Sequence, residues 1–307
     1  MSDLRLAVIG VGHLGQHHAR ILEAMPGVTL VGVADIKGDR ARDVASRHAT
    51  TAFTDAAELL GRVDGVCIAT PTIAHVDVAL PFIASGAAVL VEKPIAASLA
   101  DADRLLAAAA ARGTLVATGQ TERFNPAVAA ALPLVSSPRF IEIHRLGTFP
   151  ERSLDIDVIF DLMIHDLDVL LAIVREEVVA VEAVGVNVLT PRVDIANARL
   201  RFASGCIANL TASRISRERV RKARFFQHDA YVSIDYAAQE LEMYRLVPHD
   251  GGRPVIEGGR IEVASDEPLR RELEDFVSAI RDKRPPAVTG SDGRAALALA
   301  TRISELL

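Results

Sequence analysis

The chain has 307 residues, of which 50% are hydrophobic and 24% are charged, and its formal net charge is -6. This composition is typical of a globular protein, and the length exceeds one usual core, so two domains are expected. The negative charge disfavours nucleic-acid and membrane-surface partners, and the longest apolar run, at 105–111, is too short to cross a bilayer.

The start of the chain and its cysteines favour the cytoplasm. The opening "MSDLRLAVIG" carries Asp3 and Arg5 and runs directly into a glycine-rich turn, which does not fit a signal peptide. Cys67 and Cys206 are far apart in apolar, strand-like runs. We therefore expect buried thiols in a reducing compartment, with no disulfide and no metal site.

The first 120 residues alternate strand-like and helix-like runs. Strand patterns lie at 4–10, 28–35, 64–70, 87–92 and 114–119, and helix patterns at 13–24, 73–86 and 98–113. Short apolar strands without strict alternation indicate a parallel sheet that is covered on both faces. The sequence therefore predicts a doubly wound α/β domain of the Rossmann type over residues 1–120.

The pattern changes after residue 120. A helix pattern at 157–174 is followed by alternating runs at 178–189, 197–214, 224–236 and 239–246, and an amphipathic helix ends the chain at about 291–307. Alternation is typical of antiparallel strands with one buried face. We expect an α+β second domain over residues 121–307 that binds substrate and forms oligomers, with a last helix that is a candidate to pack back on the first domain.

The stretch "VIGVGHLG" has the G-x-G-x-x-G pattern, after a strand and at the start of a helix. Gly10, Gly12 and Gly15, with His13 and Leu14 between them, are therefore predicted to hold a dinucleotide pyrophosphate at the helix N-terminus.

The second strand ends at Asp35, twenty positions after Gly15. A carboxylate there accepts hydrogen bonds from an adenosine ribose and repels a 2′-phosphate, which predicts NAD as the cofactor. Lys37 and Arg40 leave NADP open as the weaker alternative.

The next two strands end in polar residues on the same predicted sheet edge, where such folds bind ligands. Thr70 and Pro71, with His75 on the following helix, are expected cofactor neighbours, as are Glu92 and Lys93.

In "VLVEKP", Pro94 disfavours the helical region for Lys93 and so holds the lysine extended; a cis Lys93–Pro94 bond would aim the amine more sharply. A lysine beside a nicotinamide can donate hydrogen bonds to a substrate hydroxyl and stabilise negative charge on its oxygen. The alternative is a surface turn with two solvated charges.

The motifs "GVGHLG", "ATPTIAH" and "VLVEKP", in this order and spacing, resemble the Gfo/Idh/MocA oxidoreductase family. The resemblance implies an N-terminal Rossmann domain and a C-terminal domain with an open, mostly antiparallel sheet. It also implies that Lys93 is a catalytic and substrate-orienting residue.

Asp161 and His165 are four residues apart in a predicted helix and share one of its faces. The pair fits a capped polar pair in the core or two metal ligands, although no third ligand is evident. The family resemblance implies instead that His165 is the general base and that Asp161 orients the substrate or the imidazole ring. Of the neighbouring Asp166 and Asp168, one is expected to be solvated.

Two longer stretches, "GQTERFNPAV" and "GTFPERSLDIDVIFDLMIHDLD", are similar to a subgroup of that family, the UDP-N-acetylglucosamine 3-dehydrogenases. The similarity implies that Arg123, Asn125 and Arg152 contact a nucleotide sugar, because arginine suits a diphosphate and an amide suits sugar hydroxyls. The alternative is a domain-linking loop with salt-bridged arginines.

A basic stretch, "SRISRERVRKARFF", starts at Ser213 in this otherwise acidic chain. It fits two interpretations, a surface that attracts the diphosphate of the substrate and an exposed strand edge that charge protects from aggregation. Because no aromatic residues interleave with the charges, it does not indicate nucleic-acid binding.

Together with the family resemblance, these features predict an NAD-dependent dehydrogenase that acts on a secondary hydroxyl of a sugar. The similarity to the subgroup implies that this is the 3-hydroxyl of a UDP-N-acetyl-hexosamine, and the family's open sheet face implies a homodimer or homotetramer. The alternatives are an inositol or other free-sugar dehydrogenase of the same family, an NAD-dependent glycosidase that uses transient oxidation, and a nucleotide-sensing module without catalysis.

Overall fold

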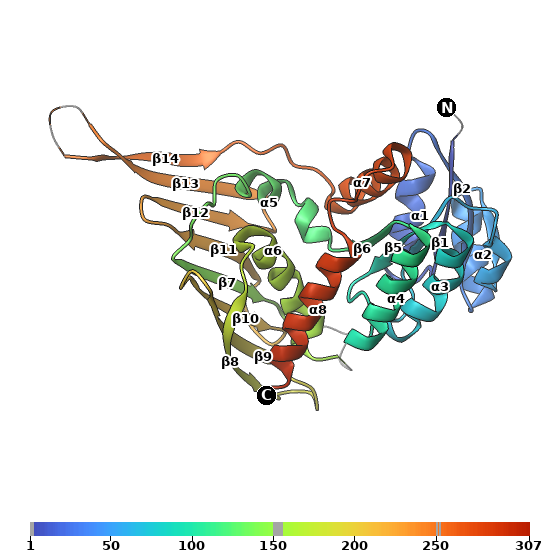
Figure 1. The fold of residues 1–307 in the computed structure, drawn as a ribbon, viewed down its shortest axis with the longest axis horizontal. Helices are drawn as coiled ribbons and strands as arrows, with labels where there is room; N and C mark the ends of the chain where they lie inside the picture. Colours follow the sequence, from blue (N-terminus) through green and yellow to red (C-terminus); the bar gives the residue numbers. More distant parts are fainter. Residues whose placement is uncertain (1–2, 150–155, 250, 252) are drawn as a thin grey trace. The chain divides into compact units, whose positions relative to one another are not determined.

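The computed structural model describes residues 3–149, 156–249, 251 and 253–307, and the chain divides into two compact units (Figure 1). Unit 1 comprises Met1–Gln120 and Leu269–Leu297, and unit 2 comprises Thr121–Pro268 and Ala298–Leu307. Among the described residues, no helix is long and apolar enough to span a bilayer.

The helices and strands of unit 1 alternate along the chain. They are β1 (Leu4–Ile9), α1 (Gly15–Glu23), β2 (Val28–Ala34), α2 (Gly38–Arg47), β3 (Thr51–Phe53), β4 (Gly65–Ile68), α3 (His75–Ser85), β5 (Ala88–Glu92), α4 (Leu99–Arg112), β6 (Val116–Gly119), α7 (Pro268–Asp282) and the first part of α8 (Gly290–Ser304). The six strands form one parallel sheet in the order β3-β2-β1-β4-β5-β6. This confirms the expected doubly wound Rossmann domain.

The register of this sheet brings the predicted nucleotide residues together. Ile9, at the end of β1, pairs with Ala34 of β2 and with Ile68 of β4. The three strands therefore end side by side, and the segments that follow them leave from one edge of the sheet. That edge is where open α/β sheets bind their ligands.

Unit 1 also contains Leu269–Leu297, a segment from near the end of the chain. Leu273 and Phe276 of α7 are buried in the same apolar cluster as Leu6 of β1 and Leu22 of α1. The amphipathic face of α7 thus completes the core on one side of the parallel sheet.

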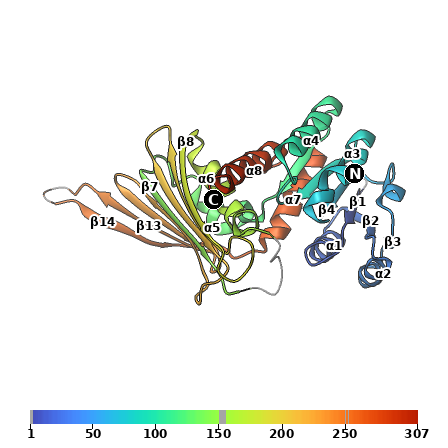
Figure 2. The same cartoon turned by 90° about the horizontal axis from the view of Figure 1, so that it is seen from below.

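Unit 2 is built on eight strands with helices against one face (Figures 1 and 2). Its elements are α5 (Pro126–Ala131), β7 (Phe140–Leu146), the π-helix η4 (Ile159–Met163), α6 (Ile164–Val174), β8 (Val178–Val186), β9 (Ile195–Phe202), β10 (Ile207–Ser213), β11 (Val220–Phe226), β12 (Ala230–Asp235), β13 (Glu240–Val247) and β14 (Val255–Ile261). The strand order is β14-β13-β12-β11-β7-β10-β9-β8, and only β7 and β10 pair in parallel among these described strands.

The strands of unit 2 alternate buried and more exposed residues, which explains their alternating sequences. In β7 the buried positions are Ile141, Ile143 and Arg145, and helix α5 contacts β12 and β13 from the helical side. The open, mostly antiparallel sheet is therefore confirmed. Strands β7 and β14 were not expected, and β11 is flanked by β12 and β7, so the interpretation of the basic stretch as an exposed strand edge is wrong.

Candidate functional site

A cavity of about 600 Å³ opens in unit 1 where strands β1, β2 and β4 end. Its lining consists of Ile9, Gly10, Gly12, Ala34, Asp35, Ile36, Lys37, Arg40, Thr54, Asp55, Ala56, Ala69, Thr70, Pro71, Ala74 and Val78. The predicted cofactor residues Gly10, Gly12, Asp35, Thr70 and Pro71 all belong to this lining.

The glycine-rich turn has the geometry that a dinucleotide requires. Gly10 has a φ of +83°, and a Cβ there would lie 2.7 Å from the backbone of Ala69 and Thr70. A Cβ on Gly15 would clash with the carbonyl oxygen of Gly10, so the first residue of α1 packs directly against the backbone of the turn. Of the described residues, a Cβ at Gly12 would meet only Arg40, at 3.7 Å, which leaves the backbone open toward a ligand.

Within the part of the chain that the structure describes, helix α1 starts without a side-chain cap. Leu14 holds the N-cap position, where no side-chain hydrogen bond is made. The first N–H groups of a helix have no partner within the helix and carry partial positive charge. The turn that contains His13 and Leu14 can therefore present backbone donors to a pyrophosphate.

The carboxylate of Asp35 lines the cavity and also holds the backbone of the glycine-rich turn. It accepts hydrogen bonds from the backbone N–H of Val11 at 3.1 Å and of Lys37 at 2.9 Å. The guanidinium of Arg40 lies 3.3 Å from the same carboxylate. A carboxylate fixed in this way suits a ribose diol, and its charge disfavours a 2′-phosphate.

Thr70, at the end of β4, carries a polar atom that is available to a cofactor. Its Oγ1 is buried and has no hydrogen-bond partner among the described residues. Because buried hydroxyls are nearly always hydrogen-bonded, an acceptor or donor from a ligand is the natural partner. The residues of the cavity therefore fit NAD.

His75 lies beside the cavity without lining it. The ring is 1% exposed, and its nitrogens lie 2.9 Å from the carbonyl oxygens of Thr70 and Pro94. Burial lowers the pKa of His75, against the opposing effect of these two carbonyls. His75 thus connects the segments that follow the adjacent strands β4 and β5, and a direct contact between His75 and the cofactor stays a prediction.

Strand β5 ends at Glu92, Lys93 follows it directly, and the Lys93–Pro94 bond is cis. Lys93 is half-buried, whereas Glu92 is 5% exposed. The Glu92 carboxylate lies 2.9 Å from Nε2 of His18 and accepts a 3.2 Å hydrogen bond from the backbone N–H of Lys93. The carboxylate points into the core, Glu92 is not among the residues that line the cavity, and its contact with the cofactor stays a prediction.

In unit 2, Asp161 and His165 lie where a π-helix passes into an α-helix. Asp161 is in η4, where the N–H of Ile164 donates to the carbonyl of Ile159, five residues earlier. His165 is the second residue of α6, and both side chains are half-buried. Single π-turns inside helices occur frequently at functional sites.

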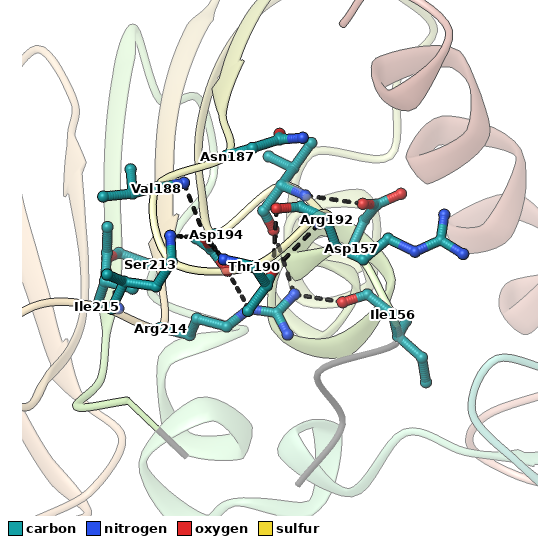
Figure 3. Close-up of polar contacts among 12 residues, drawn as sticks. Ile156, Asp157, Asn187, Val188, Thr190, Arg192, Asp194, Ser213, Arg214 and Ile215 are labelled. Atoms are coloured by element: carbon teal, nitrogen blue, oxygen red, sulfur yellow. Dashed lines mark hydrogen bonds and ion pairs between the residues drawn. The ribbon is translucent and has the colours of Figure 1, made fainter. Parts of the chain in front are cut away.

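The segment that leads into η4 is held by a buried arginine (Figure 3). Arg214 is 2% exposed, and its guanidinium donates to the carbonyl of Ile156 and, at 3.2 Å, to that of Val193. Asp157 accepts a 2.9 Å hydrogen bond from the N–H of Val193. Arg214, the first arginine of the basic stretch, is therefore a buried structural residue. It holds the backbone at Ile156, in the segment that precedes Asp161.

Asp194 organises the loop on the other side of Arg214 (Figure 3). It is fully buried and accepts hydrogen bonds from the N–H groups of Val188, Leu189 and Thr190 at 2.9, 2.7 and 2.9 Å. Burial alone would raise the pKa of Asp194, but these donors and the Thr190 hydroxyl outweigh it and lower the pKa to about 2.

A buried ion network lies directly beneath α6. Arg145 of β7 donates two 2.8 Å hydrogen bonds to Asp166 and one of 2.9 Å to Glu122. Its guanidinium also lies 5.1 Å from the ring centroid of Tyr236. Asp166 and Asp168 are each 2% exposed, so the expectation that one of them is solvated is wrong.

The predicted substrate residues have different surroundings. The guanidinium of Arg123 lies 3.6 Å from the carboxylate of Asp168. Asn125 is the N-cap of α5, and its amide accepts from Ala127 and donates to the carbonyl of Tyr236 at 2.9 Å. Asn125 is 2% exposed and caps the helix here, and its contact with a sugar stays a prediction. Arg152 lies outside the described residues.

Two models of protein families match the chain. The model described as "Oxidoreductase family, NAD-binding Rossmann fold" matches residues 4–120, and the GFO/IDH/MocA C-terminal domain matches residues 142–230. The first range contains all six strands of the parallel sheet of unit 1, and the second contains most of β7 and all of β8 to β11 of unit 2.

Characterised proteins are similar over the whole chain. The UDP-N-acetylglucosamine 3-dehydrogenase of Acidithiobacillus ferrooxidans is 40% identical over 99% of this chain and 97% of its own. Its solved structure, GnnA, superposes with a TM-score of 0.93 over 100% of this chain and 98% of that chain. The myo-inositol 2-dehydrogenase of Thermotoga maritima is 28% identical over 96% of this chain and 94% of its own.

Proposed function

The chain belongs to the Gfo/Idh/MocA oxidoreductase family, and we propose that it is an NAD-dependent dehydrogenase that oxidises the 3-hydroxyl of UDP-N-acetylglucosamine to a ketone. The observation that supports this choice of substrate is the 40% identity to a UDP-N-acetylglucosamine 3-dehydrogenase across 99% of this chain. The dinucleotide cavity, with its open glycine turn and buried Asp35, agrees with the family's cofactor.

The proposed binding of NAD uses groups of unit 1. The backbone of Gly10 and Gly12 holds the pyrophosphate, Asp35 holds the adenosine ribose, and Thr70 and Pro71 contact the rest of the dinucleotide. Bound NAD supplies the acceptor for a hydride.

The proposed chemistry assigns one task to each of three side chains. His165 accepts the proton of the substrate 3-hydroxyl as general base. Lys93 donates a hydrogen bond to the same oxygen and stabilises the negative charge that develops on it. Asp161, one turn before His165, orients the substrate or the imidazole ring. The position of Lys93 at a strand end beside the cofactor crevice supports this assignment, as does the π-turn at Asp161.

The proposed recognition of the nucleotide sugar uses arginines. Arg123 and Arg152 remain the predicted contacts for a diphosphate, which guanidinium groups bind in bidentate fashion. Arg217, Arg219 and Arg221 of the basic stretch are exposed and add positive potential on unit 2.

A second candidate is an inositol dehydrogenase. It is favoured by the 28% identity to a myo-inositol 2-dehydrogenase over 96% of this chain. A free polyol has no diphosphate, so such an enzyme would not depend on the arginines. The two candidates share NAD and the general base, and only the substrate separates them.

The test is reduction of NAD by the purified protein with UDP-N-acetylglucosamine, UDP-N-acetylgalactosamine, myo-inositol and scyllo-inositol in parallel. We expect NADH and a product that has lost two hydrogens with the first substrate. Turnover with an inositol alone would favour the second candidate. Release of free sugar without net NADH would indicate the glycosidase, and NAD binding without turnover of any substrate would indicate a sensor.

The proposed enzyme is a homodimer or homotetramer of the cytoplasm. The outer strands of unit 2 expose apolar side chains, among them Val184 of β8 and Ile256 of β14, which are 58% and 75% exposed. Such residues on an open sheet fit a second subunit. The buried free thiols of Cys67 and Cys206 fit a reducing compartment. Sedimentation as a monomer at micromolar concentration would contradict the assembly.

A further inference from the structure

Three buried polar side chains meet below the end of strand β5, and none has a role in the chemistry proposed above. His18 comes from α1, Glu92 from β5 and Glu272 from α7, with exposed fractions of 0%, 5% and 2%. Their nearest ligating atoms all lie within 4.8 Å of one another. Burying polar groups is costly unless they satisfy one another, so the cluster requires a reason.

Glu92 is the centre of this cluster. Its Oε1 lies 2.9 Å from Nε2 of His18, and its Oε2 accepts a 3.2 Å hydrogen bond from the peptide N–H of Lys93. Nδ1 of His18 has no hydrogen-bond partner among the described residues. We therefore assign the ring proton to Nε2, where His18 donates it to Glu92. Each carboxylate oxygen of Glu92 then accepts one of these two hydrogen bonds.

A glycine leaves the room that this carboxylate occupies. Gly119 of β6 is the cross-strand partner of Glu92. A Cβ on Gly119 would lie 2.9 Å from Cδ and from both carboxylate oxygens of Glu92. His18, the N–H of Lys93 and the bare backbone of Gly119 thus define one position for the carboxylate.

We propose that His18 is a positioning residue for Lys93. His18 holds the Glu92 carboxylate, and the carboxylate holds the peptide N–H of Lys93, so that the lysine leaves the strand in one orientation. The inference rests on the proposed function, in which the Lys93 amine meets the reacting oxygen. None of the three cluster residues lines the dinucleotide cavity, so loosening the cluster affects turnover more than NAD binding.

Four variants test this role. His18→Phe keeps the shape of the ring and removes the donor, and His18→Gln keeps an N–H near the position of Nε2. Gly119→Ala displaces the Glu92 carboxylate without changing either partner. His48→Phe, the same exchange at the half-exposed C-cap of α2, is the matched control.

The readouts are kcat, KM, the affinity for NAD, thermal stability and the hydrogen exchange of the Lys93 amide. We expect kcat to fall roughly 10- to 100-fold in His18→Phe and Gly119→Ala, because small misplacements of a reacting group cost up to about 100-fold. The Lys93 amide should exchange faster in both, while KM and NAD affinity stay unchanged. His18→Gln should recover most of both losses, and His48→Phe should match the wild type.

Two outcomes would overturn the inference. The first is a His18→Phe protein that is less stable than the wild type but keeps the wild-type kcat and the wild-type exchange of the Lys93 amide. If His18→Phe does not fold, the same result in Gly119→Ala would overturn the inference. The second is one equivalent of a divalent cation in the purified wild type that His18→Gln loses, because the cluster would then be a metal site. If the wild type turns over no nucleotide sugar, the proposed function fails by itself, and the Lys93 amide exchange still decides the positioning role.

Discussion

Arg145 and Asp166 form a bidentate ion pair inside unit 2, with both hydrogen bonds 2.8 Å long, and Asp166 directly follows His165. Burial raises the pKa of Asp166, although Arg145 opposes this effect. Arg145 also binds Glu122, and together these two acids hold the pKa of Arg145 well above its usual value in spite of burial. The network fixes the rotation of α6 and hence the direction of the proposed general base.

Arg145→Met should be strongly destabilising, because it leaves the buried Asp166 and the half-buried Glu122 without their cation. We expect a loss of about 3–5 kcal/mol in the free energy of unfolding, measured by urea denaturation. The matched control is Arg224→Met, because the Arg224–Glu142 pair is also 2.8 Å long but about one third exposed. That control should cost at most about 1 kcal/mol. Equal costs for the two variants would contradict the structural role of the network.

Asp194 should make the stability of the protein sensitive to acid. The pKa of Asp194 is lowered from 3.8 to about 2 in the folded state, so its stabilising effect is complete above pH 3.8 and is lost as the pH falls through about 2. Asp194→Asn should therefore lower the free energy of unfolding at pH 7, and the difference from the wild type should shrink between about pH 4 and pH 2. Urea denaturation across this range is the measurement.

The control for Asp194 is Asp39→Asn on α2, where the side chain is 98% exposed. This variant should follow the wild type at every pH. A constant difference between Asp194→Asn and the wild type down to pH 2 would show that the charge of Asp194 does not carry the effect.

Asp35→Ala should change the choice of cofactor. It removes the acceptor for the ribose and releases Arg40, which lies 3.3 Å from the carboxylate, toward a 2′-phosphate. We expect roughly tenfold weaker binding of NAD, the usual size for loss of a hydrogen bond to a charged group, and tighter binding of NADP. Titration calorimetry with both cofactors is the measurement. A wild type that prefers NADP, or a variant that still rejects it, would contradict the assignment.

Lys93→Ala and His165→Ala should fold, bind NAD and fail in turnover. Loss of a donor to the reacting oxygen costs on the order of 100- to 1000-fold in rate, and loss of a general base roughly 100- to 10,000-fold. If both act on one transition state, the double variant should lose less than the product of the single losses. His228→Ala, an exposed histidine between β11 and β12, is the control and should keep full turnover. Near wild-type turnover in His165→Ala would remove it from the mechanism.

The cofactor edge was readable from the sequence because its signals are local. The glycine spacing, Asp35 at a strand end and Thr70–Pro71 at the next strand end each follow from a few adjacent residues and from the rule for parallel sheets. The structure places Gly10, Asp35 and Thr70 around one cavity. Fold class could be predicted for the same reason, since periodicity separates buried parallel strands from half-buried antiparallel ones.

The parts that sequence reasoning missed depend on contacts between distant segments. His18 is 74 residues away from Glu92 in the sequence. Nothing in the sequence near Glu92 shows that its carboxylate points toward this histidine and not toward the cofactor crevice. Arg145 did leave a signal, because it continues the buried row of Ile141 and Ile143 in β7, and an arginine in an apolar row indicates a buried partner. Helix α7 belongs to unit 1 although it follows the strands of unit 2 in the chain. The sequence of α7 contains no comparable local signal for this.

The central claim is most directly tested by incubating the wild type with NAD and UDP-N-acetylglucosamine and following both NADH and the position of oxidation in the product. We predict one NADH for each UDP-3-keto sugar formed, with the ketone at carbon 3. NADH formation with myo-inositol but not with the nucleotide sugar, or a ketone at another carbon, would contradict the account.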